Sequence, residues 1–211
     1  QKPDLILASG DMLSGDREEG DAIAVALLSR LSDLAPVCFV NGNHEMCVER
    51  HQPERYQKFM DDLKNGGVQV LHNETAWFWI DGEKVAVTGY ELPWEYYRRF
   101  SRRHPSVVGM ERSIGKRKQD AYQILLTHNP VFFEEYAAWG ADFTFAGHLH
   151  GGFIRLPYFG GVISPQFQLF PKYDHGLYQM DTSSMVVGAG MGNHSGLFRI
   201  NNPTEIVTVR I

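Results

Sequence analysis

Apolar and amphipathic segments alternate along the first third of the chain. Residues 5–8 and 37–40 are continuous apolar runs, which are typical of strands buried on both faces. The segment between them places apolar residues at helical spacing: Ile23, Leu27, Leu28, Leu31 and Leu34. A second helix is predicted to begin at Pro53 and to bury one face: Tyr56, Phe59, Met60 and Leu63. Because parallel strands need crossover connections of this kind, the alternation predicts a parallel sheet covered by helices.

Hairpin signals appear after residue 70. Residues 75–80 and 85–88 flank Asp81-Gly82, which is a strong signal for a two-residue hairpin turn. A polar, basic stretch up to residue 120 then predicts an exposed helix.

The last part of the chain continues with strands. Residues 124–126 and 143–145 are predicted strands, with a helix at 131–139 between them. From residue 153 onward we expect short strands and turns, which close with residues 205–211. These elements together favour one α/β domain over residues 1–211, with a two-sheet core and helices outside.

Composition excludes several classes of protein. A chain of 211 residues can bury a full core, and 43% hydrophobic with 21% charged residues indicates a globular rather than a disordered chain. The net charge of -5 argues against a general nucleic-acid coat, and no apolar run approaches the roughly 20 residues that span a bilayer. Basic residues gather in 91–120, which predicts either a solvated face or a patch that attracts phosphate groups or an anionic membrane.

Polar motifs follow the predicted strands, where α/β folds place their ligands. In chain order they are Gly10-Asp11, Gly42-Asn43-His44-Glu45, His128-Asn129, and Gly147-His148 with His150. Carboxylate, amide and imidazole groups of this kind hold divalent cations that can activate water against phosphorus. The ordered set therefore predicts most of a two-metal phosphoesterase site. Taken alone, Gly10-Asp11 is more typical of a turn and His128 of an exposed loop, whereas His148 with His150 is the strongest local signal.

Individual side chains suggest individual roles. The Asp11 carboxylate is the natural bridge between two cations, and Asn43 offers a neutral oxygen. His44 can donate or accept a proton near neutral pH, and Glu45 is expected to orient it through a hydrogen bond. His148 and His150, two positions apart at a strand end, are expected to aim their rings to one side.

Other candidates near the motifs favour structural roles. Five histidines have no partner at ligand spacing and are predicted to be surface or structural: His51, His72, His104, His175 and His194. The aromatic residues beside the basic stretch are expected to form a packed helix face: Trp94, Tyr96, Tyr97 and Phe100.

The motifs together resemble the calcineurin-like metallophosphoesterase superfamily. Its pattern is Asp-x-His, Gly-Asp, Gly-Asn-His-Asp/Glu, a lone His and Gly-His-x-His, and the last four stand here in order from Asp11 to His150. The tail is similar to that of a bacterial branch of small, often membrane-anchored phosphohydrolases: Gly188-Ala189-Gly190, Arg199 and Glu205-Ile206. The resemblance implies a four-layer αββα sandwich of two mixed sheets flanked by helices.

The resemblance also implies the division of the site between two divalent ions, which would be manganese, iron or zinc. Asp11 would bridge both ions, with Asn43, His128 and His148 completing one site and His150 binding the other. His44, aided by Glu45, would stabilise the attacked phosphoryl group or protonate the leaving oxygen. Hydrolysis would then proceed by attack of a metal-bound hydroxide.

The first family motif is missing from this sequence. None of the twelve Asp residues has a His two positions later. In the family that motif lies on a preceding strand, so we expect a domain that lacks its first strand. One ion should then be held firmly and the second weakly, with reduced turnover.

Two classes of function remain open. The first is metal-dependent hydrolysis of a phosphodiester or phosphomonoester, with a nucleotide- or lipid-linked small molecule as substrate. No stable nucleic-acid partner is expected. Membrane association through a missing N-terminus is expected. The alternative is a non-catalytic metal- or phosphate-binding domain that has lost one metal site.

Overall fold

A small parallel sheet forms the first half of the fold. The computed structural model describes residues 2–15, 18–98, 103–152, 155–156, 160–162, 169–192 and 199–211. The sheet has the order β1-β2-β3, and all its pairings are parallel. Its strands are β1 (Ile6–Ala8), β2 (Val37–Phe39) and β3 (Val68–Val70). The connecting helices are α1 (Asp21–Ser32), α2 (Asn43–His51) and α3 (Pro53–Asn65). The predicted parallel sheet with crossover helices is thus confirmed.

A larger mixed sheet forms the second half, with the order β10-β11-β7-β6-β5-β4. Its strands are β4 (Thr75–Ile80), β5 (Glu83–Tyr90), β6 (Tyr122–Thr127), β7 (Phe143–Ala146), β10 (Gly176–Met180) and β11 (Ser183–Val187). The two outer pairs are antiparallel and the inner pairings are parallel. Asp81 and Gly82 turn between β4 and β5 with φ of 50° and 85°, which confirms the predicted hairpin. A short ladder joins β8 (Arg155–Leu156) to β9 (Gly160–Gly161).

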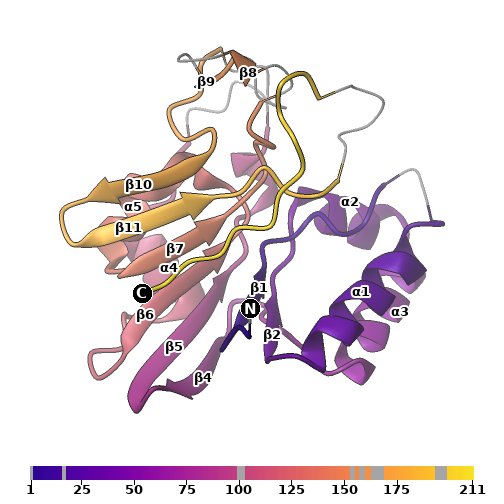
Figure 1. Ribbon diagram of the computed structural model, residues 1–211, viewed down its shortest axis with the longest axis horizontal. Helices are drawn as coiled ribbons and strands as arrows, with labels where there is room; N and C mark the ends of the chain where they lie inside the picture. Colours follow the sequence, from indigo (N-terminus) through magenta and orange to yellow (C-terminus); the bar gives the residue numbers. More distant parts are fainter. Residues whose placement is uncertain are drawn as a thin grey trace.

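The two sheets face each other with helices on both outer sides (Figure 1). Their inner faces meet in one apolar cluster, which includes Val40 and Leu71 on one side and Val87, Ile124 and Leu126 on the other. Helices α1 and α3 pack on the outer face of the small sheet. Outside the large sheet lie η1 (Trp94–Tyr96), α4 (Val107–Ile114), η2 (Pro130–Phe132) and α5 (Phe133–Trp139). The arrangement is the predicted four-layer αββα sandwich.

The prediction for α1 is right about part of its buried face and wrong about the rest. Ala24 and Leu28 are the buried residues of this helix, whereas Ile23 is 71% exposed. Leu34, which is 61% exposed, lies beyond the helix end at Ser32. Leu31 is partly buried and also packs against this core, so part of the apolar stripe faces the small sheet and its Ile23 side does not.

Three other predictions need correction or completion. The helix α2, which the sequence did not suggest, begins directly at the Asn43 motif. Residues 205–211 belong to no strand. The basic stretch contains the short helix α4 rather than one continuous exposed helix. Beyond the end of α4, Arg117 donates a hydrogen bond to Asp142 at 2.9 Å. Arg99, Phe100 and Arg102 lie outside the described residues.

The described helices are all too short or too polar to cross a lipid bilayer.

Candidate metal centre

Asp11 lies in a tight loop after β1, at the edge where β2 also ends. Gly10 and Asp11 both have left-handed backbone conformations, with φ of 87° and 57°. Asp11 Oδ1 accepts the backbone N–H of His44 at 2.9 Å. A Cβ on Gly42 would lie 2.2 Å from that same oxygen, so the close approach of the two loops requires glycine.

Two histidines from the large sheet complete the centre. His128 follows β6 and His148 follows β7, and one ligand atom from each lies within 4.8 Å of the others and of an Asp11 oxygen. His128 Nε2 is 2.9 Å from Asp11 Oδ2 and 3.1 Å from His148 Nδ1. His128 Nδ1 is 2.5 Å from the carbonyl of Ser9, which fixes the proton on Nδ1 and turns Nε2 toward the centre.

Two unpartnered atoms fit a divalent cation, one on His148 of the trio and one on Asn43, which precedes His44. Asn43 Oδ1 and His148 Nε2 are buried, and neither has a hydrogen-bond partner among the described residues. Buried polar atoms are nearly always satisfied, so each orphan needs an explanation. A carboxylate, an amide oxygen and two imidazoles form a donor set that suits manganese, iron or zinc. Asp11, Asn43, His128 and His148 therefore fit a metal site.

The local charges prepare these groups for a metal. Burial alone would raise the pKa of Asp11, but the nearby histidines, His128 foremost, together outweigh it and lower that pKa below its usual value. Burial alone would lower the pKa of His128, yet Asp11 raises it. Burial and the charge of His128 lower the pKa of His148 well below its usual value, so His148 is neutral and one of its ring nitrogens offers a lone pair. A cation bound here would displace the proton shared by Asp11 and His128.

His150 lies in a turn rather than on a strand. The strand β7 ends at Ala146, and His148 and His150 both have left-handed φ, of 64° and 50°. The expectation that strand alternation turns the His148 and His150 rings to one side is therefore wrong, because neither residue lies on a strand. Leu149 between them is fully buried, which anchors the turn in the core. His150 is not part of the ligand trio, although its charge lowers the pKa of His148, so its ring lies within electrostatic reach of the trio.

Glu45 does not act as the sequence suggested. Its side chain is fully buried, and its four described hydrogen bonds all accept backbone N–H groups. Oε2 accepts from Asp11 and Gly42 at 2.8 Å, and Oε1 accepts from Met12 and Leu13 at 2.7 and 2.8 Å. Glu45 therefore holds the Asp11 loop against the start of α2, and its position acts on Asp11 rather than on the His44 ring.

Comparison with known proteins agrees with this geometry. The family model for the calcineurin-like phosphoesterase matches residues 1–152. The chain belongs to this family. Its enzymes are phosphoester hydrolases that use metal ions, which agrees with the ligands that the structure brings together.

Individual relatives are distant. This phosphoesterase is 26% identical to phosphodiesterase YaeI of Escherichia coli, over all of this chain and 71% of that protein. It is 24% identical to the uncharacterized metallophosphoesterase YkuE of Bacillus subtilis, over 90% of this chain and 62% of that protein. The phosphopantetheinyl hydrolase of Mycobacterium tuberculosis superposes with a TM-score of 0.51 at 14% identity, over 89% of this chain and 79% of that one. The sulfate thiohydrolase SoxB of Thermus thermophilus superposes with a TM-score of 0.54 at 15% identity, over 89% of this chain and 34% of that one. These two structures show a shared fold.

Tyr97 is a site residue that the sequence did not reveal. Its ring centre lies 5.3 Å from that of His148 and 6.0 Å from that of His128, edge-on to the first at 75°. Burial raises the pKa of Tyr97 well above its usual value, so the hydroxyl stays protonated. The sequence placed Tyr97 on a packed helix face, because nothing in its neighbourhood signals contact with two histidines some 30 and 50 residues later.

Replacing Tyr97 tests whether its ring positions the two histidines. Tyr97→Leu should weaken metal binding by about 10- to 100-fold, the range typical of groups that orient metal ligands. Tyr97→Phe keeps the ring and should bind metal as the natural chain does. Titration with Mn²⁺ measures both. Equal losses in the two variants would show instead that the hydroxyl matters.

The remaining histidines that the structure describes have partners elsewhere. His72, His104 and His175 lie within 2.7–3.0 Å of Glu91, Glu135 and Glu205, and His51 Nδ1 lies 2.8 Å from the carbonyl of Cys47. His194 is outside the described residues.

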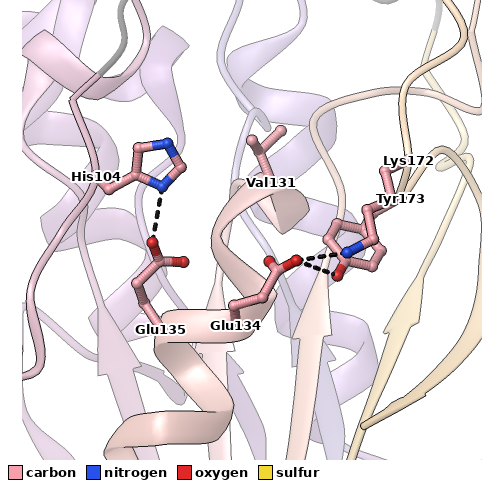
Figure 2. A pocket seen from close by; sticks show the side chains of 6 residues that line it. All are labelled: His104, Val131, Glu134, Glu135, Lys172 and Tyr173. Atoms are coloured by element: carbon pink, nitrogen blue, oxygen red, sulfur yellow. Dashed lines mark hydrogen bonds and ion pairs between the residues drawn. The ribbon is translucent and has the colours of Figure 1, made fainter.

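A hollow of about 320 Å³ on the outside of the large sheet is lined by none of the metal ligands (Figure 2). Its lining residues are His104, Val131, Glu134, Glu135, Lys172 and Tyr173. The charged ones pair with each other: His104 with Glu135 at 2.7 Å and Lys172 with Glu134 at 2.5 Å. The lining therefore offers a phosphate ester no unmatched positive charge.

Proposed function

We propose that this chain hydrolyses a phosphoester with a hydroxide generated at a site for two divalent ions. The observation that carries the proposal is the convergence of Asp11, His128 and His148. The buried, unpartnered Asn43 oxygen supports it, because the residues on either side of Asn43 both contact Asp11. Asp11, Asn43, His128 and His148 would hold one ion, and Asp11 with His150 the other. We expect the first ion to be held firmly, because four side chains would bind it. The second should be held weakly, because only His150 and the shared Asp11 would bind it.

The residues of the site divide the work. Bound ions would activate water and neutralise the charge that develops on the phosphoryl group. His44 stands at the start of α2, with its backbone N–H fixed to Asp11 Oδ1. From there its ring stabilises the phosphoryl group or protonates the leaving oxygen.

The substrate proposal is broader. Hydrolysis of a phosphodiester is favoured over that of a monoester by the name of the phosphodiesterase relative from Escherichia coli. A nucleotide- or lipid-linked small molecule would meet this description, and it would reach the site without a stable nucleic-acid partner. We also propose that this protein associates with a membrane, which the resemblance of residues 188–206 to the membrane-anchored bacterial branch supports.

His44→Gln separates an enzyme from a metal-binding module. The change keeps the backbone bond to Asp11, so the chain should retain its metal while the rate falls by about 10²- to 10⁴-fold, as for other general acids. If His44 protonates the leaving oxygen, the loss should be larger with a phenyl than with a nitrophenyl phosphodiester, because the poorer leaving group needs the proton more. Rates with Mn²⁺ and metal content per chain are the measurements.

The matched control is His51→Gln, which changes an exposed histidine at the other end of the same helix. It should leave the rate unchanged. A His44→Gln chain with full metal content and an unchanged rate would favour the non-catalytic binding domain.

A further inference from the structure

The turn that carries His150 is held by a segment near residue 202. Asn202 is 4% exposed, and its Nδ2 donates to the backbone carbonyl of His150 and, at 2.8 Å, to that of Gly152. One amide group thus joins both ends of the turn. Asn202 also packs directly against its middle, since a Cβ on Gly151 would lie 2.8 Å from Asn202 Oδ1.

The turn needs such external support. His150, Gly151 and Gly152 have φ of 50°, 69° and 81°, so three successive residues are left-handed. Glycine adopts this region freely, but a histidine does so only where its surroundings impose it. The contacts made by Asn202 are therefore part of what fixes the His150 backbone.

Two charged residues fix the segment that carries Asn202. Arg199 Nη2 donates to the carbonyl of Ala189 at 2.7 Å and lies 3.5 Å from His150 Nδ1. Glu205 Oε1 accepts the N–H of the same Ala189 at 2.8 Å. The segment is thereby tied to the loop after β11, the strand that pairs with β7. We call Arg199, Asn202 and Glu205 the C-terminal clamp.

We propose that the C-terminal clamp, and Asn202 above all, positions His150 as a ligand of the second ion. The inference rests on the proposed two-ion site. Nothing in the family match covers these residues, because the model matches only residues 1–152. The second ion would then depend on a segment some 50 residues away in sequence from the ligand it supports.

Mn²⁺ titration of three variants tests the proposal. Asn202→Asp keeps the shape but loses both donated hydrogen bonds, and Asn202→Ala removes the group without adding a buried charge. Both should weaken the weaker class of Mn²⁺ sites by about 10- to 100-fold and leave the tighter class unchanged. His150→Ala should abolish the weaker class. The exposed Thr204→Ala is the matched control and should bind as the natural chain does.

Hydrogen exchange in the metal-free chain provides a second readout. The amides of Leu149 and Gly152 bond within the turn, at 2.7 Å each, and should exchange about tenfold faster in both Asn202 variants. The amides of β7 should not change, which excludes general unfolding. Unchanged hydrogen exchange in the turn would overturn the role of Asn202. So would an Asn202→Ala chain whose weaker Mn²⁺ site keeps its natural affinity, provided that His150→Ala has lost that site. A His150→Ala chain that still binds Mn²⁺ at both classes of site would instead contradict the two-ion proposal itself. Hydrogen exchange would then be the measurement that shows whether the C-terminal clamp fixes the turn.

Discussion

Asp11→Asn should remove the metal and reduce hydrolysis by roughly a thousandfold or more. Asp11 is the one carboxylate in the ligand trio, and its loss removes charge stabilisation worth several kcal/mol, at about 1.4 kcal/mol for each factor of ten. Asparagine has the same shape, and its Oδ1 can still accept the His44 N–H, so the loops around it should keep their arrangement. Elemental analysis after reconstitution with Mn²⁺ measures the effect on binding.

The natural chain is the reference for this experiment. It should carry one firm ion and a second one that is lost on dialysis, whereas Asp11→Asn should carry none. Asp4→Asn, at an exposed position just before β1, is the matched control and should bind as the natural chain does. Full metal content in Asp11→Asn would contradict the assignment of Asp11 as the bridging ligand.

Glu45→Gln should lower the free energy of unfolding by about 2–6 kcal/mol. An amide nitrogen would replace one of the two carboxylate oxygens, each of which accepts two backbone N–H groups. Two buried N–H groups would then lack acceptors, at about 1–3 kcal/mol each. Because two of these four donors belong to Asp11 and Gly42, metal affinity should fall as well.

Chemical denaturation measures this loss of stability. Glu49→Gln is the control, since Glu49 lies one turn later on α2 and is exposed. It should change the unfolding free energy by less than about 0.5 kcal/mol. A similarly small change for Glu45→Gln would mean that Glu45 is not what holds the Asp11 loop.

Periodicity predicted the elements whose amphipathic pattern is strong. All four apolar residues expected on α3 are buried, and the Asp81-Gly82 hairpin forms as expected. The pattern is only partly right on α1, where Leu28 and Leu31 contact the core but Ile23 is left exposed. It also fails on α2, whose residues are mainly polar because the helix begins at the metal centre.

The convergence of Asp11, His128 and His148 could be predicted because these residues stand in short local motifs at strand ends. The residues that support them could not, since their contacts join distant parts of the chain. Glu45 acts on a loop some 30 residues earlier, and Tyr97 and Asn202 reach histidines about 30 to 50 residues away. None of these partners differs from ordinary core or surface residues in sequence alone.

The unpartnered atoms at the centre couple metal supply to the lifetime of the protein. Asn43 Oδ1 and His148 Nε2 are buried without hydrogen bonds among the described residues, so the metal-free fold carries a desolvation cost that a bound ion relieves. Asp11, His128 and His148 come from three separate loops and meet only in the folded chain. Binding of an ion to them would therefore add directly to folding stability, by about 4 kcal/mol at a thousandfold excess over the dissociation constant. In a metal-starved cell the phosphoesterase would therefore unfold more often and be degraded sooner, and its abundance would follow the metal it needs.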